Sequence, residues 1–299
     1  MKPIIAPVER QLLLDELTTL KKVRDTRRGG NEIYIFTAES CPNLMREIGR
    51  LREESFRAAG GGSGNEIDID EGDSSPAGYT QLIAWDPAAH EIIGAYRYII
   101  CTRPHLLNLS TEHYFRFSPK FRKLFLPRTI ELGRAFVQPR YQNHDNPKSI
   151  FALDNLWDGL GAIIAMNPRA RYLFGKVTLY SSYNIEARNA LFYFLHKYFP
   201  DKDRLIKGRN PLKTDFDTER YRQLFNGGSY EDDYRILTGH IRNHKEAIPP
   251  LINAYMNLSR TMRVFDTVSN ADLGGILDTG ILINIKDILP EKLERYTRW

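Results

Sequence analysis

The hydrophobic spacing of the first sixty residues predicts a helix, a strand and a second helix. Leucines recur at helical spacing across 12–23, whereas residues 31–37 alternate as a short strand would. Asn43 is a favourable helix cap, so the second helix is expected over 43–59. A glycine run at 60–64 ends that helix and, with the acidic stretch behind it, predicts a mobile loop.

The middle of the chain alternates between strand and helix patterns. A hairpin is expected first, because two apolar runs flank a turn at 86–90. This order is typical of an α/β (α+β) fold with a mixed central sheet. The predicted elements are strands at 79–85, 92–101, 128–137 and 172–180, and helices at 149–166 and 184–198.

The last hundred residues give a weaker pattern. Residues 200–246 are polar and are expected to be irregular, with short helices. We divide the chain into an N-terminal helical extension, residues 1–30, and one domain, residues 31–299, whose C-terminal extension begins near residue 200. The elements predicted in that extension are a helix at 251–262 and strand segments at 264–265, 275–277 and 280–285.

Composition narrows the class of protein. The 299 residues are 42% hydrophobic, which is enough for a real core. Cys41 and Cys101 are isolated, which argues against a disulfide scaffold or a zinc site. The N-terminus lacks the apolar core of a signal peptide, and no window approaches ~20 consecutive apolar residues. We therefore expect a cytoplasmic protein, with peripheral binding at the inner face of the cell membrane as an option.

Charge and missing motifs exclude several function classes. The net charge of +5 is modest and leaves acidic partners open, including an acidic carrier protein or anionic lipid. Nucleic acid is not expected, because no recognised nucleic-acid-binding pattern accompanies the charge. The histidines lack metal-ligand spacing and there is no Gly-x-Ser-x-Gly, so neither a metal site nor a serine hydrolase is expected. A basic and aromatic stretch at 119–128 suits an anionic membrane or an acidic carrier, or is a solvated loop.

Two opposite charges interrupt an otherwise apolar strand at Glu131 and Arg134. A buried carboxylate is costly unless it is paired, so these residues need partners or a cavity. Strict alternation places residues three apart on opposite faces of a strand. Both can therefore serve one site only if the strand bulges near Gly133. The alternative is an exposed pair at the edge of a sheet.

Arg97 is a similar exception in the preceding apolar strand. A neighbouring strand would place its guanidinium beside Glu131, where it would lower the pKa of the carboxylate and bind an anionic group. The alternative is an arginine that extends to solvent at the rim of the sheet.

A helix and the loop after it carry further candidates. Arg52 and Phe56 are four residues apart and share one face of the second helix. Asp68 and Asp70 lie on one side if their loop is extended, where they would hold a cationic amine. The alternatives for this acidic run are a solvated loop or a Ca²⁺ site, although EF-hand spacing is missing.

Asn184 is expected to cap the helix that follows the strand at 172–180. Tyr183 or Tyr193, on either side of that cap, could protonate a departing thiolate. Ordinary helix packing is the simpler explanation for either tyrosine.

These features, in this order, resemble the GNAT-like N-acyltransferases of bacterial aminolipid synthesis. That family includes the ornithine and glycine N-acyltransferases, also called hemolysin-like proteins, and is related to the acyl-homoserine-lactone synthases. The resemblance covers roughly residues 30–295 and implies a GNAT-like fold with a mainly antiparallel central sheet flanked by helices. It rests on Arg52 and Phe56, Asp68 and Asp70, Gly94-x-x-Arg97, Glu131-Leu-Gly-Arg134-x-x-Val137-x-Pro139-x-Tyr141 and Leu156-Trp157.

The resemblance also implies a reaction and roles for residues. The donor would be a long-chain, often 3-hydroxylated, acyl group on acyl carrier protein, and the acceptor the α-amine of glycine or ornithine. Glu131 would be the base, with Arg97 and Arg134 positioning it and the substrate carboxylate. The implied substrate-binding residues are Arg52, Phe56, Asp68 and Asp70, and the implied donor-binding residues are Val137, Gln138, Arg140, Trp157 and Asn184.

The donor assignment has a specific basis and specific alternatives. The usual GNAT pyrophosphate loop is absent, because residues 138–148 offer Arg140 and Lys148 but no glycine. This makes coenzyme A a less favoured donor than a carrier protein, and no other cofactor is expected. The alternatives are an acyl-CoA-dependent N-acyltransferase, a synthase of the acyl-homoserine-lactone type, and a non-enzymatic, hemolysin-like protein that binds membranes through residues 115–125.

Overall fold

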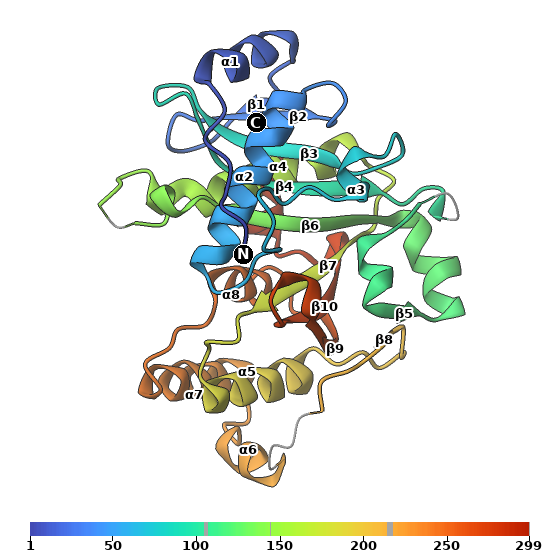
Figure 1. Ribbon diagram of the computed structural model, residues 1–299. Coiled ribbons are helices and arrows are strands. Elements are labelled where there is room, and N and C mark those ends of the chain that lie inside the picture. Colours follow the sequence, from blue (N-terminus) through green and yellow to red (C-terminus); the bar gives the residue numbers. More distant parts are fainter. Residues whose placement is uncertain (105–106, 144, 214–217, 299) are drawn as a thin grey trace.

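The computed structural model describes residues 1–104, 107–143, 145–213 and 218–298. In this part of the chain, eight strands form one sheet in the order β1-β2-β3-β4-β6-β7-β10-β9, and β5 pairs with β8 in a separate ribbon (Figure 1). The strands are β1 (Arg24–Asp25), β2 (Glu32–Phe36), β3 (Thr80–Asp86), β4 (Glu91–Ile100), β5 (Phe115–Phe117), β6 (Thr129–Val137), β7 (Tyr172–Leu179), β8 (Ile206–Gly208), β9 (Arg263–Asn270) and β10 (Ile276–Asn284).

Helices flank the main sheet on both faces. The α-helices are α1 (Arg10–Thr19), α2 (Pro42–Ala58), α3 (Glu71–Ser74), α4 (Ser149–Met166), α5 (Ile185–Tyr198), α6 (Thr218–Leu224), α7 (Tyr230–Asn243), α8 (Pro250–Met256) and α9 (Pro290–Thr297). Short 3₁₀ helices are η2 (Ser110–His113), η4 (Leu126–Arg128), η5 (Pro139–Tyr141), η6 (Ala271–Leu273) and η7 (Ile285–Asp287), and η3 (Phe121–Phe125) is a π-helical turn.

Strands β6 and β7 pair in parallel, whereas the other strand pairs described in the main sheet are antiparallel. A parallel pair needs a crossover connection, and α4 supplies it. The two faces have separate cores because side chains alternate along each strand. Ile83, Trp85 and Ala95 pack with α1 and α2, whereas Leu82 and Ala84 pack with α4 and α5.

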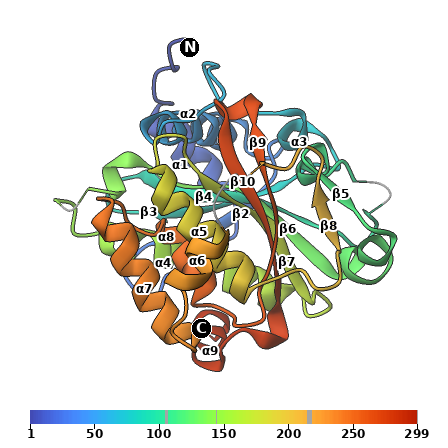
Figure 2. The same cartoon turned by 90° about the horizontal axis from the view of Figure 1, so that it is seen from below.

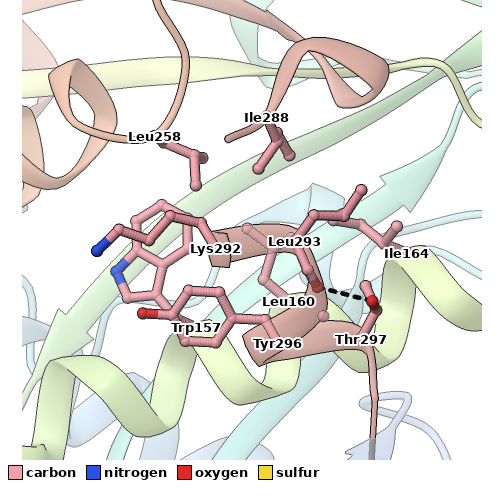
Figure 3. A pocket seen from close by; sticks show the side chains of 10 residues that line it. Trp157, Leu160, Ile164, Leu258, Ile288, Lys292, Leu293, Tyr296 and Thr297 are labelled. Carbon is pink, nitrogen blue, oxygen red and sulfur yellow. Dashed lines mark hydrogen bonds between the residues drawn. The ribbon is translucent and has the colours of Figure 1, made fainter. Parts of the chain in front are cut away.

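Helix α4 is long and apolar enough to cross a membrane, by length and composition alone. More than half of it is buried within the fold, as expected for a core helix. Gly161 allows α9 to pack closely on it, since a Cβ there would lie 1.9 Å from the carbonyl oxygen of Tyr296. The groove that remains between α4 and α9, lined by Trp157 and Leu293, has a volume of about 10 Å³ (Figure 3). That space is the size of one water molecule, so it is a packing seam and cannot hold a substrate.

The central elements confirm the expected hairpin, the strand at 128–137 and the two helices after it, with ends shifted by one or two residues. The α2 prediction was wrong about the cap: Cys41 is the N-cap and Pro42 the first helical residue, so Asn43 lies inside the helix. Helix 251–262 was predicted too long, because α8 ends at Met256 and Arg263 already begins β9.

The C-terminal extension is more regular than expected. Helix α7 has 14 residues in the stretch predicted to be irregular, and it lies beside α5 (Figure 2). The strand segments predicted at 275–277 and 280–285 are one continuous strand, β10, which pairs with β7 from Leu277 to Asn284. Strand β1 lies within the predicted N-terminal extension and pairs with β2 at the edge of the main sheet.

Candidate active site

Strand β6 contains the bulge that a shared site requires. Ala95 faces Phe136 and Arg97 faces Gly133, so two residues of β6, Arg134 and Ala135, lie opposite one residue of β4. The extra residue sits just after Gly133, as predicted. Arg134, rather than the glycine, takes the left-handed conformation, with φ of 53°.

Glu131 is fully buried on this central strand, which excludes the exposed edge pair. Its carboxyl accepts hydrogen bonds from Tyr79 Oη at 2.5 Å, Thr111 Oγ1 at 2.8 Å and Ser110 Oγ at 3.2 Å. Burial raises the pKa of Glu131 above its ordinary value, although these hydrogen bonds oppose the shift. A buried carboxyl with a raised pKa is a suitable proton acceptor for chemistry near neutral pH.

Arg97 does not pair with Glu131, so the expected contact between them was wrong. Its guanidinium lies over the ring of Tyr79, 4.3 Å from the centroid, and the Tyr79 hydroxyl in turn donates to Glu131. The ion-pair partners of Arg97 are Asp70 at 2.6 Å and Asp73 at 3.0 Å. Arg97 is 1% exposed, which also excludes an arginine extending to solvent at the rim.

Three arginines and three aspartates alternate in a chain of ion pairs beside Glu131. The contacts run from Arg52 to Asp73 (2.9 Å), Asp73 to Arg97 (3.0 Å), Arg97 to Asp70 (2.6 Å), Asp70 to Arg134 (3.2 Å) and Arg134 to Asp68 (2.9 Å). Equal numbers of opposite charges let the group be buried without a net charge. We call these six residues the Arg–Asp chain.

The Arg–Asp chain reaches solvent mainly at Asp70 and Arg134. Arg52 and Asp73 are buried, whereas the Asp70 side chain is 36% exposed and that of Arg134 18%. Burial would raise the pKa of Asp70, but Arg97 and Arg134 outweigh it and hold that pKa well below its ordinary value. Burial raises the pKa of Asp68 despite the nearby Arg134. Asp70 therefore keeps a negative charge in the exposed part of the Arg–Asp chain, where it can meet an amine.

Asp73 was not among the predicted residues, although it is the most buried carboxylate of the Arg–Asp chain. Its sequence signal was present: Asp70 and Asp73 cap each other reciprocally at the start of α3, and a carboxylate three residues after a cap is the pattern of a capping box. Phe56, predicted with Arg52, is half-buried and packs against the α2 core.

The sheet divides between β6 and β7 immediately after Glu131. Their parallel ladder contains three residue pairs, the last of which is Glu131 opposite Phe174. A Cβ on Gly175 would lie 2.8 Å from the carbonyl oxygen of Leu132, so the strands still touch there. Beyond this point β6 pairs with β4 alone and β7 with β10 alone, and Ala135 is exposed although it lies on a central strand. We call this opening the split.

Two of the predicted donor-binding residues have partners that explain their positions. The Gln138 side chain donates to the carbonyl of Ile92, and Arg140 pairs with Glu91 at 2.6 Å. Val137 is the half-buried last residue of β6.

The other two lie on α4 and at the N-cap of α5, and Trp157 belongs to the core cluster against which Val137 packs. Trp157 packs edge-on against Tyr255, with ring centroids 5.2 Å apart. Asn184 caps α5 as predicted, accepting from the backbone N–H groups of Glu186 and Ala187.

An open cavity of about 270 Å³ lies between the end of α2 and η5, just after β6. Its lining residues in the described chain are uncharged: Ser55, Ala58, Ala59, Pro139, Gln142 and Asn143. The described residues also contain no cluster of metal-ligating side chains.

The sequence of this chain is similar to those of known acetyltransferases and acyltransferases. Residues 51–152 match the family model described as an acetyltransferase (GNAT) domain. The Glycine N(alpha)-acyltransferase of Bacteroides thetaiotaomicron is 48% identical over 302 residues, covering 99% of this chain and 90% of that protein. The protein of the same name from Phocaeicola vulgatus is 46% identical, with 99% and 93% covered.

Solved structures are more distant. The acyl-homoserine-lactone synthase LasI aligns with a TM-score of 0.35 at 17% identity, over 49% of this chain and 71% of that one. An aminoglycoside 6'-N-acetyltransferase complexed with coenzyme A aligns with a TM-score of 0.28 at 9% identity, over 71% and 74%.

Proposed function

The chain belongs to the family of the glycine N(alpha)-acyltransferases, and we propose that it transfers a long-chain acyl group from acyl carrier protein to the α-amine of glycine. That it is an acyltransferase with a GNAT domain follows from the two relatives and the family match. Glycine is the acceptor named for both relatives, which favours it over ornithine. The 3-hydroxylated chain and the aminolipid product rest on the family resemblance.

The observation that carries the proposal is the position of the split relative to Glu131. Beyond Glu131 and Phe174 no further residue pair joins β6 to β7 in the described chain, so the two strand edges that face each other there are outside any ladder. Unpaired strand edges bind extended ligands through main-chain hydrogen bonds. An acyl thioester lying in the split would bring its carbonyl close to the one fully buried carboxyl of β6.

The reaction moves two protons from the nitrogen. An ammonium must lose the first proton before its nitrogen attacks the thioester carbonyl; a C–N bond then forms, the C–S bond breaks, and the second proton passes from the nitrogen to the departing thiolate. Glu131 would accept the first proton. Since its oxygens are covered by hydroxyls of Tyr79, Ser110 and Thr111, the proton would reach it through one of these groups or a water.

A carrier-protein donor suits the loop after β6 better than coenzyme A does. A pyrophosphate needs free cations or a row of backbone N–H groups. Arg140 is paired with Glu91, and Lys148 with Asp86 at 2.6 Å. The neighbouring cavity of about 270 Å³ has no charged lining residue in the described chain. Neither cation of this loop is therefore available for a pyrophosphate without breaking an ion pair.

A basic surface next to the split gives an acidic carrier a place to dock. Arg116 of β5 lies directly opposite Lys207 of β8, both side chains are exposed, and neither has an ion-pair partner among the described residues. Like charges directly opposite each other destabilise a strand pair, so an anionic partner would relieve this repulsion. Exposed Lys123 extends the surface along η3.

This basic surface is only one layer of side chains from the reactive strand. On the inner side of the same segment, Phe117 and Phe121 pack against Phe174, with ring centroids 5.6 and 5.5 Å apart. Phe174 is the residue of β7 paired with Glu131. A carrier docked on Arg116 and Lys207 would therefore lie over the split.

The test is a purified assay with an acyl carrier protein thioester and glycine. Equal amounts of N-acylglycine and free thiol should appear, and Glu131→Gln should abolish both. Glu54→Gln is the matched control, because Glu54 is a partly exposed surface residue paired with Arg50. Expression in a host without aminolipids, followed by lipid mass spectrometry, would identify the head group and chain of the cellular product.

Each alternative has its own signature in the same assay. Consumption of acyl-CoA but not of the carrier thioester would overturn the donor assignment. Exclusive reaction with ornithine would overturn the assignment of glycine as the acceptor. A lactone formed from S-adenosylmethionine would show a synthase of the acyl-homoserine-lactone type instead. Membrane lysis without any thioester consumption would support the non-enzymatic, hemolysin-like protein instead.

A further inference from the structure

A second polar cluster lies across the split from the Arg–Asp chain. Lys176 on β7 forms an ion pair with Asp278 on β10 and lies 4.3 Å from the centroid of the Tyr114 ring. Asp278 is fully buried and also accepts from Thr178 Oγ1 at 2.7 Å and Asn270 Nδ2 at 2.7 Å. None of these residues was singled out by the sequence or by the reaction described above.

The cluster faces the same space as Glu131 and Arg134. Glu131 pairs with Phe174, so continuing the register by two residues places Gly133 level with Lys176 across the split. Lys176 and Phe174 lie on the same face of β7, because side chains two apart on a strand share a face. Tyr114 belongs to this second cluster: its ring contacts Lys176, and its hydroxyl donates to Asn270 Oδ1 at 3.0 Å and Asp272 Oδ2 at 2.7 Å.

An unpaired donor borders this space on the β6 side. Arg97 Nε is buried and has no hydrogen-bond partner in the described chain. A Cβ on Gly133 would lie 3.7 Å from Nε, with no closer atom, so a small group fits beside Gly133. A buried donor without a partner is costly, and a ligand oxygen would satisfy it.

Lys176 also has capacity to bind a ligand. An ammonium has three N–H donors. In the described structure one of them pairs with Asp278, and the ammonium group lies over the Tyr114 ring. Asp278 keeps two other donors if Lys176 turns partly away. The pair could be a purely structural link between β7 and β10, but apolar residues would usually serve that purpose as well. Lys176 is a mostly buried cation whose side chain remains 17% exposed, so a ligand in the split could still reach it.

We infer that Lys176 binds the carboxylate of the amino-acid acceptor, opposite the space beside Gly133. This inference rests on the proposed function and names the group of that site that recognises the acceptor as an amino acid. The exposed Asp70 lies on the other side of the split and offers the ammonium an opposite charge. A zwitterion fits between clusters of mixed charge, whereas a simple amine would leave Lys176 and Arg97 Nε unsatisfied.

The experiment compares glycine with glycinamide, which has the same size and amine but no carboxylate. Wild type should prefer glycine. In Lys176→Met the KM for glycine should rise about 10- to 100-fold, as expected for loss of a charge-assisted hydrogen bond, with kcat changed much less. The kinetic constants for glycinamide should stay near those of wild type. Lys176→Arg should retain most of the preference, because it keeps the charge.

Two further variants keep the test interpretable. Lys286→Met removes an exposed lysine at η7 and should leave both substrates unaffected. Lys176→Met could fold poorly because Asp278 loses its counter-ion. In that case the double variant Lys176→Met/Asp278→Asn, which removes both charges, is used in the same comparison instead of the single variant.

The possible results separate this inference from the proposed function. Equal losses for glycine and glycinamide, or a wild type that does not distinguish them, would overturn the role of Lys176 while leaving the acyltransferase in place. If another amino acid proves to be the acceptor, the same comparison with its amide decides the matter. If no amine is acylated, the proposed function fails and the inference fails with it.

Discussion

The hydroxyl of Tyr79 lies 2.5 Å from Oε1 of Glu131, while the ring of the same tyrosine carries the guanidinium of Arg97 on its face. Tyr79 therefore connects the reactive carboxyl to the Arg–Asp chain without a direct ion pair. Hydroxyl donors stabilise a carboxylate less than a guanidinium would. This is why burial dominates and the pKa of Glu131 is raised, whereas the pKa of Asp70 is lowered by its arginines.

Tyr79→Phe should shift the pH dependence of acyl transfer to higher pH. As a base, Glu131 must be ionised, so the rate rises as pH passes its pKa. Burial raises that pKa and the Tyr79 hydrogen bond lowers it, so loss of the hydroxyl should raise it further. The measurement is kcat/KM against pH. Tyr34→Phe is a matched control, since Tyr34 donates to Glu32 at 2.9 Å on β2; an unshifted acidic limb in Tyr79→Phe would argue against Glu131 as the base.

The contacts of Tyr79 mark the limit of inference from the sequence at this site. The bulge could be predicted from Glu131 and Arg134 alone, because period-two alternation forbids them from sharing a face. The partner of Arg97 could not be predicted, because it depends on a loop, residues 68–73, whose path is set by tertiary contacts. Asp73 was missed for the same reason, although its capping pattern with Asp70 is local.

The fold shows a comparable boundary between local and tertiary signals. Helix α4 and strand β7 are long, mainly apolar runs and were predicted nearly to the residue. Helix α7 is amphipathic but polar on average and buries only Asp233, Leu237 and Ile241, so its segment was predicted to be irregular. Strand β10 was predicted as two segments separated by the polar residues Asp278 and Thr279, but both are buried within one strand. Each has a polar partner on β9: Asp278 accepts from Asn270, and Thr279 hydrogen-bonds with Thr267.

Asp73→Asn should destabilise the fold much more than Asp70→Asn. Asp73 has a side chain 1% exposed and lies between Arg52 and Arg97, so its loss leaves two buried cations short of a counter-ion. Breaking a buried pair costs about 3–5 kcal/mol, whereas a pair as exposed as Asp70 contributes about 1 kcal/mol or less. Urea unfolding measures the difference. Equal losses in the two variants would mean that the Arg–Asp chain is not anchored at Asp73.

Gly175→Ala should reveal where the split begins. Its new Cβ would lie 2.8 Å from the carbonyl oxygen of Leu132, which is backbone and cannot move aside cheaply. Overpacking of this kind costs about 1–3 kcal/mol in the free energy of unfolding. Gly133→Ala is the matched control and lies on β6, two residues after Glu131. Its Cβ would meet nothing closer than 3.7 Å, so the free energy of unfolding should stay within about 0.5 kcal/mol of that of wild type. A neutral Gly175→Ala would place the start of the split before Gly175.

Arg116→Glu should move stability and carrier binding in opposite directions. The substitution turns the like-charged pair of Arg116 and Lys207 into an opposite-charged pair, which should stabilise the β5–β8 ribbon by about 0.2–1 kcal/mol. The same change removes a cation from the docking surface. The KM for an acyl carrier protein thioester should therefore rise and become less dependent on ionic strength, because exposed charges are screened by salt.

The control for this last variant lies in the substrate as well as in the chain. A short pantetheine thioester without the carrier should react equally well with wild type and Arg116→Glu, since the split itself is unchanged. Lys286→Glu makes the same charge change at an exposed lysine of η7 and should leave the KM for the carrier thioester near that of wild type. If Arg116→Glu is stabilised but its carrier KM is unchanged, the repulsion between Arg116 and Lys207 is real and the carrier docks elsewhere. If both thioesters react more slowly, the ribbon acts through Phe117 and Phe174 on the split rather than as a docking surface.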